Sequence, residues 1–462
     1  MADYDGSRHI LEAAWRGLGG DPSMLSAVRF SEPGALPCHF AVADLAAGSM
    51  AAAALAAAEL VALQSGRPPE VVVNRALATG WFHTVIEPQG WQMPPFWHPL
   101  CADYRASDGW IRLHTNIPSH AQAVVETLGV AEDADVVAAA VATWKADDLE
   151  SAILEHGGAA ARMRSRAAWI DHPQGRAAQR EELVHVTNRS NESKEHFDIA
   201  PQRPLAGARI LDLTRGVAGP VATRCLAGYG ADVLRIDPPG WEEPAVVPDI
   251  VLGKRRARLD LRSEAGRDRL RQLVSEADMV VHGYRPGALD WLALDNEHQS
   301  HIPAGLIDVR LNAYGWAGPW SSRRGFDSLV QMSSGMADEA MAAAGSDRPV
   351  QLPMQALDEA TGYLMAASAM RALAERVRTG RGRRVRCSLA RTAEMLIAAR
   401  RWSGEPELPS RSSMFMTSPT VDTGWGPARR LPVPILVAGV PLAWDIPAGP
   451  LGSHAPDWLP RQ

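Results

Sequence analysis

The chain has 462 residues, 46% of them apolar and 22% charged, so it can bury a large core and two domains are expected. Its formal net charge of −6 gives no overall attraction to a polyanion, so we expect no nucleic-acid partner. The four cysteines have neither disulfide nor zinc spacing, which predicts no metal site and a reducing, cytoplasmic location.

The first half begins with an Ala-rich helical stretch and continues into a small domain. The most apolar part of the helix, Met50 to Leu63, is interrupted by Glu59, so we expect a packed helix and no membrane partner. The stretch from Tyr104 to Gly129 has the pattern of a hairpin, a strand and then a helix, which predicts a small α+β domain.

A polar segment from about Thr187 to Pro204 separates the two halves and is nearly free of large aliphatic residues. After it, apolar runs alternate with helical stretches, which is the pattern of βαβ units. We therefore predict an α/β fold with a doubly wound, mostly parallel, Rossmann-like sheet and long hinge helices. The expected strands are 208–213, 231–236, 279–282 and 305–311, and the expected helices are 220–229 and 264–277.

These patterns divide the chain into five segments. They are an N-terminal segment 1–97, a small α+β domain 98–186, a linker 187–203, a ligand-binding α/β domain 204–400, and an extended tail 401–462 rich in Pro and Trp. The tail has only short apolar runs, so we expect it to pack over the core as extended chain without chemistry of its own.

One segment of the chain is used twice. Ala43 to Val73 parallels Leu357 to Cys387 without a gap, and in each copy an Asp precedes a Gly by 4 residues and a second Gly by 22. A long helix with Asp at its start and a Gly-Arg turn after it is therefore repeated. Asp44 and Asp358 are the two equivalent carboxylates.

Asp358 is the strongest candidate for a reactive group, although an N-cap role alone would also explain it. A carboxylate with an ordinary pKa near 3.9 is ionised at pH 7 and attacks a thioester without a general base. Small residues nearby, such as Ala360 and Gly362, would let a substrate come close.

Three further segments could contact a ligand. The turn from Asp212 to Pro220 follows a strand and opens a helix, but lacks the GxGxxG spacing of a nicotinamide site. The run from Gly253 to Arg258 holds four cations, among them Lys254 and Arg255, which could bind phosphates or form a solvated surface. The segment from His282 to Gly287 combines an aromatic ring, a guanidinium and a tight turn, which suits a nucleotide.

In this order, these segments resemble the family III CoA-transferases, which include formyl-CoA transferase, carnitine CoA-transferase and the α-methylacyl-CoA racemases. The resemblance covers roughly residues 204–396. Its motifs are ILDLTRGVAGPVATRCLAGYGADVLRIDPPG, GKRRARLDLRSEAGRDRL, VVHGYRPGALDWLAL, AYGWAGPWSSRRGFDSLVQMSSG and LDEATGYLMAASAMRALAERVRTGRGRRV. The first half is similar to the family's later segments, so the order of the halves is rearranged.

The resemblance implies roles for individual residues. Asp358 matches the family's catalytic aspartate, which forms an anhydride with the acyl group and then an aspartyl-CoA thioester. Residues that match positions lining the CoA site are Val217, Ala218, Tyr284, Arg285 and Arg324. Phe326 stands where the racemases have a histidine.

The leading hypothesis is thus a CoA-transferase acting on an acyl-CoA and a carboxylic acid, with CoA as a substrate and no tightly bound cofactor. An acyl-CoA racemase or isomerase is the second hypothesis, and it ranks lower because Phe326 replaces the histidine that transfers the proton in the racemases. A catalytically silent CoA-binding subunit is the third. The resemblance also implies a homodimer, possibly with interlocked chains.

Overall fold

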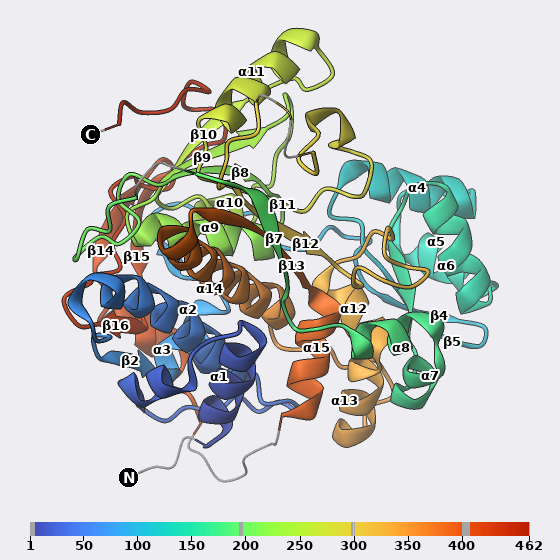
Figure 1. Cartoon of the computed structure of the whole chain (residues 1–462). Coiled ribbons are helices and arrows are strands. Elements are labelled where there is room, and N and C mark those ends of the chain that lie inside the picture. Colours follow the sequence, from blue (N-terminus) through green and yellow to red (C-terminus); the bar gives the residue numbers. More distant parts are fainter. Residues whose placement is uncertain (1–4, 194–196, 297–298, 300, 400–406, 462) are drawn as a thin grey trace.

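The computed structural model describes all residues except 1–4, 194–196, 297–298, 300, 400–406 and 462 (Figure 1). Its centre is a seven-stranded sheet in which six strands are parallel and the edge strand β7 is antiparallel to β13. The strands, in spatial order, are β10 (Lys254–Arg258), β9 (Asp232–Asp237), β8 (Arg209–Leu213), β11 (Met279–His282), β12 (Ile307–Asn312), β13 (Arg381–Ser388) and β7 (His185–Glu192). The predicted α/β class with a mostly parallel sheet is confirmed.

Helices pack on this sheet because its central strands, such as β8 and β9, have apolar side chains on both faces. On one face, alternate side chains such as Ile210 and Val233 share a core with α9 (Ala218–Gly228) and α14 (Ala356–Thr379). Leu211 and the other alternate side chains pack with α11 (Glu264–Ser275). The chain order reverses between β8 and β11, and such a switch point is where open α/β sheets bind ligands beyond the carboxyl ends of their strands.

The repeat is larger than the sequence predicts. The unit β1 (Val28–Ser31), α2 (Val42–Ser65), β2 (Val71–Asn74) and α3 (Arg75–Trp81) mirrors β12, α14, β13 and α15 (Leu389–Ala398). In each unit the two strands are parallel, and a further strand pairs antiparallel with the second one: β16 (Ile435–Val437) with β2, and β7 with β13.

The two long helices, α2 and α14, pack side by side (Figure 1). Both end at a glycine with a left-handed backbone, Gly66 at φ 76° and Gly380 at φ 73°, which is the conformation that favours glycine after a helix. The predicted packed helix is therefore confirmed: α2 is buried over most of its length. It is also the one described helix that is long and apolar enough to cross a membrane.

The small domain contains the predicted hairpin and helix, followed by further elements. They are β4 (Asp103–Ala106), β5 (Gly109–Leu113), α4 (Pro118–Leu128), α5 (Ala134–Val141), α6 (Ala146–Glu155), β6 (Ala160–Arg162), α7 (Arg166–Asp171) and α8 (Pro173–Arg180). Part of the predicted linker is instead strand β7, while residues 194–196 lie outside the described residues. A polar edge strand needs few aliphatic residues, since much of it is exposed.

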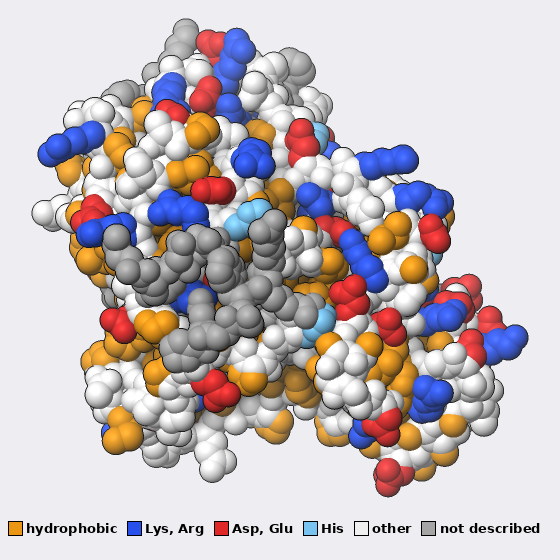
Figure 2. All heavy atoms as spheres, turned by 90° about the horizontal axis from the view of Figure 1, so that it is seen from below, with side chains coloured by type: hydrophobic (Ala, Val, Ile, Leu, Met, Phe, Trp, Pro, Cys, Tyr) orange, Lys and Arg blue, Asp and Glu red, His pale blue; other side chains and the backbone are white. Residues whose placement is uncertain are grey.

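The tail packs over the N-terminal segment, partly as paired strands. It contributes α16 (Arg411–Met416), β14 (Thr420–Thr423), β15 (Gly426–Arg430) and β16, and β15 pairs with β3 (Ile86–Pro88). The predicted boundary at residue 400 lies outside the described residues. The remaining helices are α1 (Asp5–Gly17), α10 (Val247–Ile250), α12 (Asp327–Ser334), α13 (Met336–Ala344) and short 3₁₀ turns at Pro22–Ala27 and Asp290–Leu292. On the face drawn in Figure 2, charges of both signs are interspersed.

Candidate active site

Asp358 lies in the first turn of α14, but it is not the N-cap. The cap position is Gln355, which makes no side-chain cap bond. The cap is supplied by the buried carboxylate of Asp327, whose Oδ2 accepts hydrogen bonds from the backbone N–H groups of Leu357 (2.8 Å) and Asp358 (3.0 Å). The alternative in which Asp358 serves only as an N-cap is therefore wrong, and its carboxylate is not committed to the helix end.

The Asp358 carboxylate is half-buried, and no described residue donates a hydrogen bond to it. Burial, together with the nearby carboxyls of Asp327 and Glu359, raises its pKa well above the ordinary value. The assumption of an ordinary pKa near 3.9 is thus corrected by the structure. A carboxylate that is costly to ionise is also more basic, so it is a stronger nucleophile once the proton has left.

Asp44 occupies the equivalent first-turn position of α2, yet its surroundings differ. Its Oδ1 accepts bonds from Arg75 Nη2 (2.8 Å) and the Ser7 hydroxyl (2.7 Å), and the Arg75 side chain is 1% exposed. Asp44 is therefore a buried ion-pair partner. In the second copy the residue 31 positions after the aspartate is Leu389, so Asp358 has no such cation.

Sequence reasoning missed Arg75, although the repeat contained the signal. The residues just before these positions, Asn74 and Ser388, are both N-caps: each side chain accepts from the N–H three residues later. The two copies therefore present Arg75 and Leu389 at the same place, one residue inside a helix that follows the second strand of the unit. Comparing the copies as far as the ninth residue after Gly66 and Gly380 would have found the difference.

The helix of Asp358 lies directly against the turn that holds Val217 and Ala218. A Cβ added at Gly362 would lie 2.5 Å from the Ala218 carbonyl oxygen and 2.8 Å from Val221. Gly362 is thus needed for the close approach of α14 to α9, and the interpretation that it leaves room for substrate is corrected. The contact brings the helix of Asp358 close to the turn from Asp212 to Pro220, the first of the candidate ligand-binding segments. Val217 is half-buried and Ala218 is buried.

At the switch point, an arginine is held between two aromatic rings. The Arg215 guanidinium lies 4.8 Å from the Trp241 ring centre and 5.0 Å from that of Tyr284, and it donates to the Tyr284 hydroxyl (2.7 Å). Arg285, next in the chain, is exposed. The predicted Tyr284-Arg285 turn therefore lies beside the turn after β8, and Arg215 is a member of this cluster that the sequence analysis did not single out.

Arg324 is a second cation near this turn. Its Nη1 donates to the carbonyls of Gly157 and Gly158 (3.2 Å to the latter), which ties it to the small domain. Burial and the charge of Arg285 lower its pKa, so the two guanidinium groups act on each other electrostatically. Two cations with few anionic neighbours suit a phosphate-bearing ligand.

Lys254 and Arg255 do not belong to this region, and the prediction that they contact phosphates is corrected. Lys254 is fully buried, with Nζ 2.9 Å from Asp212 Oδ2 and 2.8 Å from the Pro220 carbonyl oxygen, and burial lowers its pKa to about 8. Arg255 pairs through both Nη2 bonds with Asp232. Nor do they form a solvated surface, since both side chains are almost completely covered.

Comparison with known proteins supports the family resemblance for the second half. Residues 205–407 match the model of CoA-transferase family III. This segment belongs to that family. The chain is similar to a probable fatty acyl-CoA transferase of Mycobacterium tuberculosis, with 32% identity over 194 residues covering 39% of this chain and 49% of the relative. It also resembles a succinyl-CoA:glutarate CoA-transferase of Mus musculus, with 31% identity over 205 residues and coverage of 42% and 47%.

The chain spans about half the length of these relatives or less, down to 33% of an acetyl-coenzyme A transferase of Hypoxylon pulicicidum. Among solved structures, a CaiB/BaiF family protein from Brucella suis has 26% identity and a TM-score of 0.38, covering 49% of this chain and 65% of that one.

Proposed function

We propose that this protein is a CoA-transferase that moves CoA between an acyl-CoA and a carboxylic acid, with Asp358 as nucleophile. The observation that carries the proposal is the contrast within the repeat. Asp44 is neutralised by Arg75, whereas Asp358, at the equivalent position, has a raised pKa and no cationic partner among the described residues. A perturbed, half-buried carboxyl beside a ligand-binding switch point is typical of a reactive group.

In the proposed reaction, an Asp358 oxygen attacks the thioester carbonyl, forming a mixed anhydride and releasing the CoA thiolate. The thiolate then attacks the Asp358 side-chain carbonyl, which gives an aspartyl-CoA thioester and frees the first carboxylic acid. The acceptor carboxylate attacks that thioester, which forms a second mixed anhydride with Asp358 and expels the CoA thiolate. The thiolate then attacks the acceptor's acyl carbonyl in this anhydride, which gives the new acyl-CoA and releases Asp358 as the free carboxylate. Asp358 attacks as the carboxylate, after its proton has left, and the thiolate and the acceptor carboxylate are already anions, so the later steps need no base.

CoA, as substrate and not as a bound cofactor, is placed in this proposal at the switch point. The Arg215–Tyr284 pair offers flat cationic and aromatic surfaces, and Arg285 and Arg324 offer charge for phosphates. Ala218 at the start of α9 lies against α14 and so connects this end of the ligand with Asp358. A doubly wound sheet, predicted from the sequence, would provide this crevice.

The test is to incubate the protein with a panel of acyl-CoA donors and to analyse its peptides by mass spectrometry. We expect mass corresponding to CoA or the acyl group on the peptide containing Asp358 and none on the Asp44 peptide. Hydroxylamine should remove the added mass, since it cleaves anhydrides and thioesters. Exchange of CoA between acids with no adduct at Asp358 in any trapped sample would overturn the assignment of the nucleophile.

A racemase or isomerase stays the second candidate, because two imidazoles lie beside Phe326, the residue that stands where the racemases have a histidine. The His114 ring stacks on Phe326 with centroids 3.7 Å apart, and His120 lies 5.7 Å from the same ring. Burial lowers both pKa values, that of His120 to about 4, so both rings are neutral at pH 7 and able to accept a proton. Wash-in of solvent deuterium at the α-carbon of an acyl-CoA would favour this candidate.

A homodimer in the cytoplasm remains part of the proposal. The small-residue faces of the two long helices could have formed an interface between chains, but in the structure these helices pack against each other within one chain. A second copy would therefore use other surfaces. Light scattering at micromolar concentration tests this: a mass near 100 kDa, twice the 49.8 kDa of one chain, supports the dimer, and a mass of one chain rejects it.

A further inference from the structure

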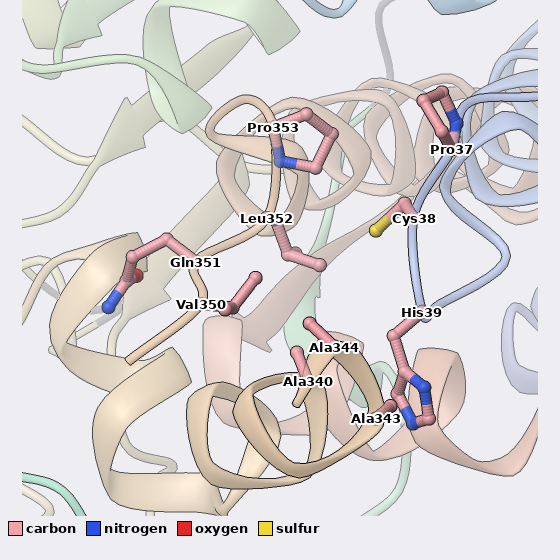
Figure 3. Close-up of a pocket in the computed structure, with 10 residues that line it drawn as sticks. All are labelled: Pro37, Cys38, His39, Ala340, Ala343, Ala344, Val350, Gln351, Leu352 and Pro353. Atoms are coloured by element: carbon pink, nitrogen blue, oxygen red, sulfur yellow. The ribbon is translucent and has the colours of Figure 1, made fainter. Parts of the chain in front are cut away.

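A pocket of about 280 Å³ lies between the N-terminal segment and the loop that leads into α14 (Figure 3). It is lined by Pro37, Cys38, His39, Ala340, Ala343, Ala344, Val350, Gln351, Leu352 and Pro353. The side chains of Val350 and Leu352 point toward the alanine face of α13, and the Cys38 sulfur points inward from the opposite side. Three of the ten lining residues, 37–39, lie outside the segment that matches the family.

The wall of this pocket is bonded to the backbone of Asp358. The Leu352 N–H donates to Gln331 Oε1 (2.7 Å), and Gln331 Nε2 donates to Asp327 Oδ1 (2.5 Å). The other oxygen of Asp327 accepts from the Asp358 N–H (3.0 Å). Two buried side chains therefore hold the pocket loop and the carboxyl-bearing turn in a fixed relation, so that an occupant of the pocket is positioned relative to Asp358.

The lining determines which ligands fit. None of the ten lining residues is Lys or Arg, so a carboxylate placed inside would find no guanidinium or ammonium partner. Three alanines, Val350 and Leu352 offer apolar surface instead. At roughly 30 Å³ for a water-sized group, the volume accommodates about nine such groups. Nine such groups correspond to a medium-length aliphatic chain.

We propose that this pocket binds the apolar tail of the acid that Asp358 processes, which makes the substrate class medium-chain aliphatic monocarboxylic acids and their CoA thioesters. The proposal rests on the proposed function for the transfer itself, but the pocket's affinity for an aliphatic tail can be measured separately. A dicarboxylic acid of similar length is disfavoured, because its second carboxylate would lie in a pocket whose lining contains neither Lys nor Arg.

The binding test uses octanoic acid with a diazirine at the tail end, photolysed on the full-length protein. We expect label on peptides containing residues 340–344 or 350–353, with competition by octanoate at least tenfold stronger than by glutarate. Ala344→Phe should remove the label by filling the pocket. Ala342→Phe is the matched control: Ala342 is exposed on the same helix and does not line the pocket, so this variant should label normally.

The kinetic test uses octanoate and acetate as acceptors with the same donor. In Ala344→Phe we expect the KM for octanoate to rise at least tenfold, while kcat/KM for acetate, whose tail does not reach the pocket, changes less than twofold. Label elsewhere, equal competition by glutarate, or unchanged labelling of Ala344→Phe would overturn the pocket proposal. Correct labelling without any CoA transfer would support the pocket and refute the transferase function, so the two failures are distinguishable.

Discussion

The two aspartates of the repeat should respond in opposite directions to the same substitution. Asp44→Asn removes the charge that compensates the buried guanidinium of Arg75, although Asn Oδ1 can still accept the two hydrogen bonds. Breaking a buried ion pair costs about 3–5 kcal/mol, and we expect the lower end, about 3 kcal/mol. The free energy of unfolding should fall by that amount.

Asp358→Asn should leave stability unchanged or slightly raise it. Loss of an acidic residue in the first helical turn costs about 0.5 kcal/mol. However, each unit by which the pKa of Asp358 is raised corresponds to about 1.4 kcal/mol that the ionised carboxyl costs at high pH, and the amide does not carry this cost. A net gain in stability is therefore expected at pH 8, opposite in sign to the loss of about 3 kcal/mol in Asp44→Asn.

The assay is urea unfolding at pH 8, followed by tryptophan fluorescence and circular dichroism, together with CoA-transfer rates at low temperature. Asp358→Asn should have no measurable turnover, and folded Asp44→Asn should stay within a few fold of the unmodified protein. Equal losses of stability in both variants would refute the argument from the Arg75 pair. Turnover retained by Asp358→Asn, or lost in folded Asp44→Asn alone, would refute the choice of nucleophile.

Three further experiments test the same site. Leu389→Arg places a guanidinium where the first copy has Arg75 and should abolish turnover by pairing with Asp358. The control variant Leu389→Met should stay active. An active Leu389→Arg would contradict the equivalence of the two copies. The pKa of Asp358 is raised in the folded state, so its contribution to stability is present below the unfolded-state pKa near 4 and is lost as pH rises through the folded-state pKa. Urea midpoints measured against pH should therefore decline less in Asp358→Asn than in the unmodified protein. Parallel declines in the two proteins would count against the raised pKa. Lys254→Met leaves Asp212 buried without its cation and should lower the free energy of unfolding by about 3–5 kcal/mol. The affinity for CoA, measured by calorimetry, should change less than twofold. A salt-dependent loss of CoA affinity would show instead that Lys254 contacts a phosphate.

Much of the second half could be predicted from sequence because its elements are defined locally. Apolar runs bounded by glycines located β8, β9, β11 and β12 to within two residues, and helices α9 and α11 similarly. Strand β7 was missed for a physical reason: an edge strand that is half exposed is free to be polar, so it has the composition of a linker.

The errors at the candidate site arise from contacts between residues far apart in the chain. Lys254 belongs to a run of cations that is typical of a surface, yet its partner Asp212 lies on another strand, 42 residues earlier. The cap of α14 comes from Asp327, 31 residues before Asp358. Neither pairing follows from local pattern, because strand order and helix placement decide which side chains meet.

The repeat explains how two equal carboxylates acquire different properties. Both lie in the first turn of a long buried helix, so the dipole and the backbone act on them alike. They differ at the position occupied by Arg75 in the first copy and Leu389 in the second, and in the carboxyls around them. The arginine forms a stabilising ion pair with Asp44, whereas Asp358 has no guanidinium at that position and lies near Asp327 and Glu359, which make it costly to ionise. A carboxylate that is costly to ionise is expected where the group must react. A carboxylate held in an ion pair would have little tendency to attack a thioester.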